Sequence, residues 1–170
     1  MIPTSTATST RITWSRIRHS RNYQISMGTE VLGSLKRPSF WSCEFIAETQ
    51  GGRWLLRRTG FFRNNAEVVD AETGRQIATF QSDWGGGGTL AFYDGQSFRL
   101  ASSGWLRPVW TFSSEQGQPV LSMHRRERTF QLPGSFAVSD SRLALLMTFI
   151  LYRVQQAEEE AATGALIAAT

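Results

Sequence analysis

Apolar and polar positions alternate with a period of two from about residue 23 to residue 138. The apolar runs are short and are separated by turns that contain glycine, which is the pattern of consecutive β-strands. The clearest case is T-L-A-F-Y-D-G-Q-S-F-R-L at residues 89–100. Here Asp94 and Gly95 supply the two positive-φ positions of a tight hairpin turn. The pattern therefore predicts a series of antiparallel hairpins.

The predicted turns recur at a regular spacing of 22, 21 and 22 residues. The turn glycines are Gly52, Gly74, Gly95 and Gly117. When the series is extended back to Gly28 and forward to the segments around Phe130 and Phe136, about ten to twelve strands result. That number fits one closed barrel or two packed sheets. A propeller is the competing fold with regular spacing, but it has no place for the segment that follows the strands.

The alternation stops after residue 138, and an apolar stretch at residues 143–152 follows the sequence Ser-Asp-Ser. Ser139 or Asp140 is placed to cap a helix. Because the stretch has no polar face, the helix must be surrounded by apolar material. Ten residues reach about 15 Å, half of the roughly 30 Å hydrocarbon core of a bilayer, and Arg142 and Arg153 bound the stretch. We therefore expect a helix over residues 143–154 that is buried in protein.

The chain ends differ from the strand-rich part. Residues 1–10 are uncharged and rich in Ser and Thr, and no acid precedes Glu30. This composition predicts a disordered tail over residues 1–22, although an organelle transit peptide shares it, and the absence of an apolar core argues against a secretory signal. We expect one domain over residues 23–162, with a polar helical segment at 155–162 and a frayed end at 163–170.

The segment leading into the apolar helix reads R-T-F-Q-L-P-G-S-F-A-V-S-D-S-R-L-A-L-L-M-T-F-I-L-Y-R. With the preceding hairpins, it resembles the tubby C-terminal-like superfamily, which includes the phospholipid scramblases and the plant LURP-one-related proteins. Over about residues 23–155 the resemblance implies a mainly β fold, a closed antiparallel barrel of about twelve strands around a central C-terminal hydrophobic helix. Tubby proteins bind phosphoinositides through basic residues, so the resemblance also implies an anionic lipid ligand.

The resemblance does not extend to a calcium site. Scramblases have an acid-rich, calcium-associated stretch near the start of this helix, whereas here only Asp140 is present. Calcium takes about six or more oxygen ligands, several of them carboxylates. Calcium binding is therefore not predicted.

The chain carries a formal charge of +4. Residues 1–37 alone contribute +5, because they contain five arginines and Lys36 but only one acid, Glu30. The planar fork of arginine suits phosphate and carboxylate groups. The candidates for an anion-binding face are Lys36, Arg37, Arg57, Arg58, Arg125, Arg126 and Arg128.

Few residues suit catalysis or metal binding. His19 and His124, with the single cysteine Cys43, are too few and too far apart for most zinc sites. Cys43 is expected to be a small apolar core residue. Because it is the single cysteine, it cannot form an internal disulfide, which favours a reducing compartment. Asp70 and Glu72 are interpreted as turn residues beside Gly74. We therefore expect no enzyme, no metal and no cofactor.

Two other features allow a functional and a structural interpretation. The glycines at 85–88 do not continue into the Gly-Lys-Ser/Thr of a phosphate-binding loop, so a loop between hairpins is favoured. The six tryptophans and eleven phenylalanines could stack on nucleic-acid bases, but we expect them to fill the core of a barrel, and nucleic acid is not a predicted partner.

These observations favour a non-enzymatic domain that binds anionic phospholipid or another anionic head group, in the cytoplasm and at the periphery of a membrane. A first alternative is a scaffold that binds a protein partner. A second is a scramblase-like protein anchored by its C-terminal helix in the bilayer.

Overall fold

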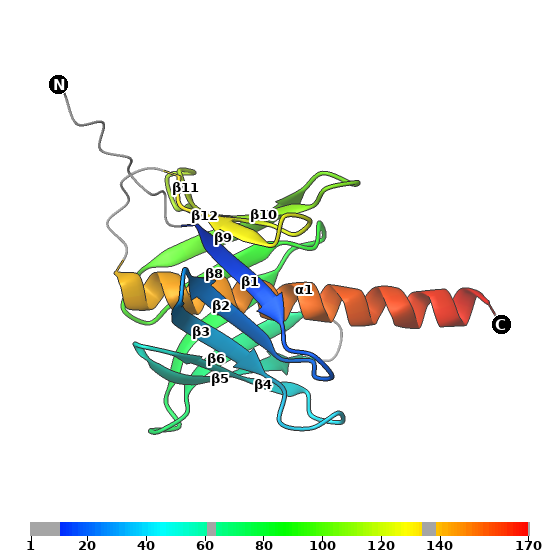
Figure 1. The fold of residues 1–170 in the computed structure, drawn as a ribbon, viewed down its shortest axis with the longest axis horizontal. Helices are drawn as coiled ribbons and strands as arrows, with labels where there is room; N and C mark the ends of the chain where they lie inside the picture. The colour runs from blue at the N-terminus through cyan, green and yellow to red at the C-terminus, as the bar shows by residue number, and fades with distance from the viewer. Residues whose placement is uncertain (1–10, 61–63, 134–138, 170) are drawn as a thin grey trace.

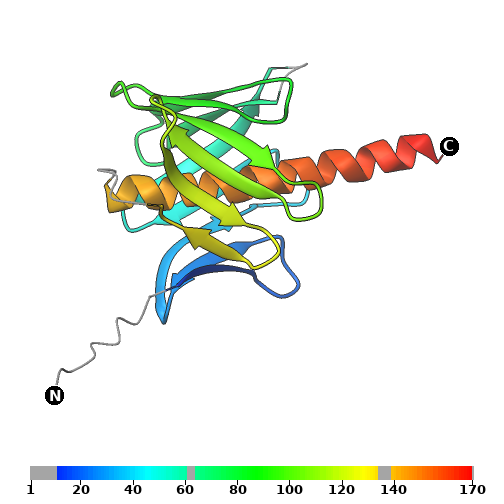
Figure 2. The ribbon, with the colours of Figure 1, turned by 90° about the horizontal axis from the view of Figure 1, so that it is seen from above.

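Twelve antiparallel strands form a closed barrel, and one long helix passes through it (Figures 1 and 2). The computed structural model describes residues 11–60, 64–133 and 139–169. The predicted fold, a closed antiparallel barrel around a C-terminal hydrophobic helix, is confirmed.

Each strand pairs with its neighbours in sequence, and β1 pairs with β12 to close the barrel, with Ile12 opposite Phe130. The strands are β1 (Ile12–Arg16), β2 (Tyr23–Met27), β3 (Glu30–Lys36), β4 (Glu44–Thr49), β5 (Gly52–Thr59), β6 (Asn65–Asp70), β7 (Gln76–Ser82), β8 (Gly88–Phe92), β9 (Ser97–Ser103), β10 (Val109–Ser114), β11 (Pro119–His124) and β12 (Thr129–Gln131). Closure leaves no unpaired edge on which another chain could add a strand.

The expected hairpin turns are present. Gly95 has a φ of 96° and Gly74 a φ of 71°, in the left-handed region that glycine adopts without strain. In β8, which precedes the Gly95 turn, Leu90 and Phe92 point into the barrel and Thr89 and Ala91 point out. The two-residue period thus separates the interior of the barrel from its outer surface.

The helix α1 (Asp140–Ala168) forms the axis of the barrel. The hydroxyl of Ser139 accepts a hydrogen bond from the backbone N–H of Arg142 at 3.3 Å, which confirms Ser139 as the cap. Residues 145–156 are buried. The ring of Phe149 lies 5.2 Å from that of Phe80 and 6.2 Å from that of Phe112. Thr148, the polar residue of this stretch, donates its hydroxyl proton to its own helix, at the carbonyl of Leu145.

Among the described residues, no helix combines the length and the apolarity that crossing a membrane requires.

The predicted domain ends need correction. β1 lies inside the segment expected to be a disordered tail, so the barrel begins at Ile12 instead of residue 23. Within β1 the side chains of Ile12 and Trp14 are buried in the barrel, and the residues between and after them are polar and exposed. The arginines and serines around these two residues gave the segment the composition of a disordered tail. The predicted tail at residues 1–10 lies outside the described residues, as does the Phe136 segment. At the other end α1 is helical through Ala168 instead of fraying from residue 163.

Two expectations about the core are wrong in part. Cys43 is exposed in the β3–β4 loop and is not a core residue. Trp14, Trp54 and Trp110 are buried as expected. The other three tryptophans are exposed on loops: Trp41 by 86%, Trp84 by 102% and Trp105 by 93%.

The position of α1 in the barrel gives a stability test with two leucines of the same helix. Leu146 is fully buried, whereas Leu166 is 71% exposed beyond the barrel. We expect Leu146→Ala to lower the free energy of unfolding by about 2–5 kcal/mol, because it removes buried methyl groups and leaves a cavity. Leu166→Ala should change it by less than about 0.5 kcal/mol. Urea denaturation followed by circular dichroism measures both, and equal effects would contradict the buried axis.

Candidate anion-binding site

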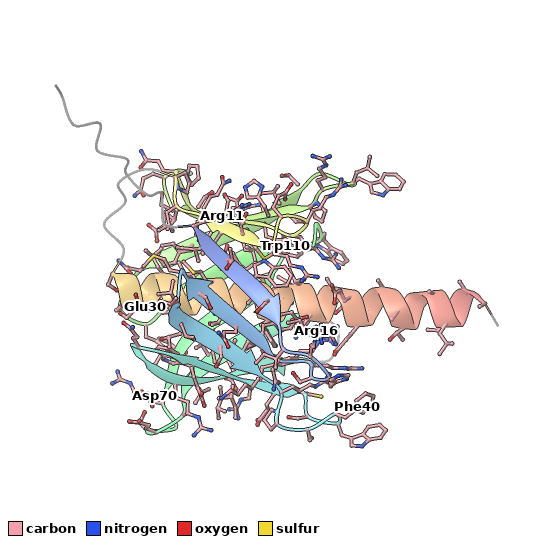
Figure 3. The ribbon with its side chains drawn as sticks, viewed as in Figure 1. Arg11, Arg16, Glu30, Phe40, Asp70 and Trp110 are labelled. Atoms are coloured by element: carbon pink, nitrogen blue, oxygen red, sulfur yellow. The ribbon has the colours of Figure 1, made fainter. Side chains whose placement is uncertain are left out.

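The six odd-to-even loops, β1–β2 through β11–β12, lie at the end of the barrel from which α1 emerges; we call this the exit end. Contacts with the emerging helix show the placement, since Arg21 of the β1–β2 loop and Arg125 of the β11–β12 loop pair with acids of α1. Figure 3 labels Arg16 and Phe40 at this end. At the opposite end, Arg142 near the start of α1 pairs with Asp94 of the β8–β9 turn at 2.6 Å.

Four arginines hold the three consecutive acids of α1 where it leaves the barrel. Glu158 pairs with Arg125. The Glu159 carboxylate oxygen Oε1 lies 2.6 Å from Arg37 and 3.3 Å from Arg21. The Glu160 carboxylate oxygen Oε1 lies 3.3 Å from Arg58 Nη2. This arginine clasp joins the helix to three loops and to β5.

Polar side chains of α1 support the clasp from inside the barrel mouth. Gln155 donates to Glu159 at 3.0 Å and accepts a hydrogen bond from the Tyr23 hydroxyl at 2.7 Å. Two residues before Gln155, Arg153 is only 4% exposed and donates to the Asn64 carbonyl and to Gln156. Burial lowers the pKa of Arg153 from its usual value. Arg153 was expected to bound the buried part of the helix, but the buried part continues past it to Gln156.

The seven basic residues predicted from the sequence do not form one face. Arg57 lies on the barrel wall, where it pairs with Glu67 and Glu44. Lys36 pairs with Glu48 at 2.9 Å, and this contact lowers the pKa of Glu48. Both residues stand near the exit-end termini of β3 and β5, but their side chains lie on the outer wall beside acidic partners, and neither lines the basic cleft.

The remaining five predicted residues do lie at the exit end. Arg37, Arg58 and Arg125 belong to the clasp. Arg126 and Arg128 lie in the β11–β12 loop and have no ion-pair partner within the part of the chain that the structure describes. The guanidinium of Arg128 lies 5.8 Å from the centre of a Trp14 ring, within cation–π range.

A cleft of about 810 Å³ opens between the β1–β2, β3–β4 and β11–β12 loops. We call it the basic cleft. It is lined by Arg16, Ile17, Arg18, His19, Ser20, Arg21, Asn22, Arg37, Pro38, Ser39, Phe40 and Arg128. Five of these described residues are arginines, and none is an acid. The cleft is therefore a concentrated positive potential at the exit end.

Sequence reasoning missed Arg16, Arg18 and Arg21, although all three line the basic cleft. The signal was present, because residues 1–37 hold the excess positive charge of the chain. The charge was assigned to a tail, whereas β1 and β2 hold these arginines in a short turn. In that turn the Arg16 Nε donates to the Ser20 carbonyl at 3.0 Å.

Two sequence features have the structural roles expected of them. Asp83 Oδ1 accepts the backbone N–H groups of Gly85 and Gly87 at 2.9 and 3.0 Å, so the glycine run forms a loop whose amides are used internally. Asp70 accepts hydrogen bonds from the backbone N–H groups of Glu72 and Thr73, which lowers the pKa of Asp70 and confirms it as a turn residue.

Within the described residues, no three His, Cys, Asp or Glu side chains are placed to hold a metal ion.

The fold and the basic cleft define the class of this protein: a closed twelve-stranded barrel threaded by its own C-terminal helix, with an arginine-lined mouth. No family model, curated protein or solved structure matches the chain.

The clasp predicts a modest, salt-sensitive contribution to stability. We expect Glu159→Gln to lower the free energy of unfolding by about 0.5–1 kcal/mol, since the carboxylate pairs with two arginines but is partly exposed. Raising NaCl to about 0.5 M should shrink the difference. Glu127→Gln is the matched control at the same end, because Glu127 is exposed and outside the clasp. Urea denaturation checks both, and identical behaviour of the two variants would rule out the clasp.

Proposed function

We propose that this protein is a non-enzymatic domain that binds anionic phospholipid head groups at a membrane surface, as the tubby-like resemblance implies. The single observation that carries the proposal is the basic cleft, an open cleft of about 810 Å³ that is lined by five arginines and no described acid, two of the arginines also pairing with Glu159 of α1.

The chemistry of the cleft fits phosphate. Guanidinium groups donate paired hydrogen bonds to phosphate oxygens and keep their charge at any physiological pH. The arginines come from the end of β1 and from three loops, so they can approach a ligand from more than one direction. Arg21 and Arg37 are already oriented by Glu159, and the entropy lost on binding is correspondingly smaller.

The ion pairs indicate which arginines dominate binding. Arg21 and Arg37 share the Glu159 carboxylate, so part of their charge is already neutralised. Arg16, Arg18 and Arg128 line the cleft, and Arg126 is beside it, without an ion-pair partner among the described residues. These four are expected to contribute most of the attraction to a negatively charged surface.

A charge-reversal experiment tests this function. We expect Arg18→Glu/Arg126→Glu to weaken binding to phosphatidylglycerol-containing vesicles by about 30-fold or more, since each arginine near an anionic surface is worth about 1 kcal/mol. The matched control is Arg11→Glu/Arg75→Glu, which makes the same change in charge at exposed positions of the opposite end. Sedimentation with vesicles at low and high salt measures the binding.

Three outcomes would contradict the proposal: no binding of the wild type, binding insensitive to salt, or equal losses in both double variants. Titration with soluble inositol hexakisphosphate separates the two sources of phosphate. Tight, saturable binding of this compound without vesicle binding would assign the cleft to a soluble phosphorylated ligand. Vesicle-independent capture of a protein, unaffected by Arg18→Glu/Arg126→Glu, would favour the scaffold alternative.

A further inference from the structure

Three tryptophans are exposed at the tips of separate loops, and all three loops lie at the exit end. Trp41 is in the β3–β4 loop, Trp84 in the β7–β8 loop and Trp105 in the β9–β10 loop. Tryptophan is highly buried on average in soluble domains, so exposed fractions of 86–102% are unusual. The remaining tryptophans are buried in the barrel.

Other large apolar side chains extend the same surface. Phe40 lies beside Trp41, with ring centres 5.0 Å apart, and is 60% exposed. Leu106 follows Trp105 and is 88% exposed. We call Phe40, Trp41, Trp84, Trp105 and Leu106 the apolar rim. It adjoins the basic cleft at the β3–β4 loop, where Arg21 lies 4.6 Å from the centre of the Phe40 ring.

The part of α1 that emerges from the barrel is uncharged beyond its three acids. Its acids, Glu158 to Glu160, are held by the arginine clasp at the barrel mouth. Residues 161–169 carry no charge and are exposed, and they project beyond the loops (Figures 1 and 2). A flat surface that touches the loops on all sides must therefore accommodate about 13 Å of uncharged helix.

An anionic bilayer surface suits all three features of the exit end: the apolar rim, the arginines of the basic cleft and the uncharged end of α1. Tryptophan rings concentrate at the boundary between head groups and acyl chains, and arginine is attracted to the anionic head groups beside them. We infer that the exit end docks end-on onto an anionic bilayer, with the apolar rim in the interfacial layer and the uncharged end of α1 inserted between lipids. This inference rests on the proposed function and adds the orientation of the protein and the residues that enter the bilayer.

The test is a vesicle titration that reads tryptophan emission. The variant Trp41→Ser/Trp84→Ser/Trp105→Ser removes the apolar rim, and Tyr93→Ser, at an exposed position of the opposite end, is the control. Vesicles carry phosphatidylglycerol with acyl chains brominated near the head group, which quench only tryptophans that reach them. Because all three tryptophan rings are exposed, thermal unfolding of the triple variant should be unchanged, and Tyr93→Ser, which removes an exposed hydrogen bond to Gln76, should change it only slightly.

The inference expects wild-type emission to shift to the blue and to be quenched on binding. The triple variant should bind about 1,000-fold more weakly, since each of the three rings that leave water contributes about a tenfold factor. Leu166→Ser/Ile167→Ser should also weaken binding, whereas Tyr93→Ser should bind as the wild type does.

The possible failures are distinguishable. Salt-sensitive binding to anionic vesicles without quenching, with the triple variant unimpaired, overturns the docking surface and leaves the head-group function standing. Quenching that is equal in neutral and anionic vesicles overturns the head-group function and supports the docking surface. A wild-type dimer that the triple variant converts to monomer, without vesicle binding, assigns the apolar rim to self-association and overturns the inference.

Discussion

The burial of a helix that is apolar on every side is the constraint on which the rest of the structure depends. Residues 145–152 are buried and have no polar face, so they require apolar side chains all round. A closed barrel of twelve strands meets this need, because every second residue of each strand points at the axis. Phe80, Phe112 and Phe149 show the result, with rings from two strands and from α1 in contact.

The same constraint places the candidate site. An axial helix must leave the barrel at one end, and the odd-to-even loops surround it there. The acids of α1 reach the mouth at the level of those loops and are neutralised by Arg21, Arg37, Arg58 and Arg125. Within the described part of the chain, the mouth keeps the positive charge of arginines that have no ion-pair partner, including Arg16, Arg18, Arg126 and Arg128, together with exposed aromatic rings.

The hairpins and the buried helix could be predicted because their signals are local. Asp94-Gly95 dictates a turn by its backbone preferences. The ten-residue stretch between Arg142 and Arg153, apolar except for Thr148, is too short to cross a bilayer and is therefore expected to be buried in protein. The site could not be predicted in the same way. Arg57 and Arg58 are adjacent in sequence, yet the two-residue period sends Arg57 to Glu67 on the barrel wall and Arg58 to Glu160 of α1. These ion pairs depend on the register of the strands and on the path of α1. Neither can be predicted from a short stretch of sequence.

Hydrogen–deuterium exchange with and without phosphatidylglycerol vesicles tests the central claim, that the end of the barrel from which α1 emerges is the membrane-facing end. Added vesicles should slow exchange at this end only, in residues 17–22, 37–43, 83–87, 104–108, 125–128 and 157–169. Slower exchange at the opposite turns, residues 28–29, 50–52, 71–75, 93–96 and 115–118, or no change anywhere, would contradict the account.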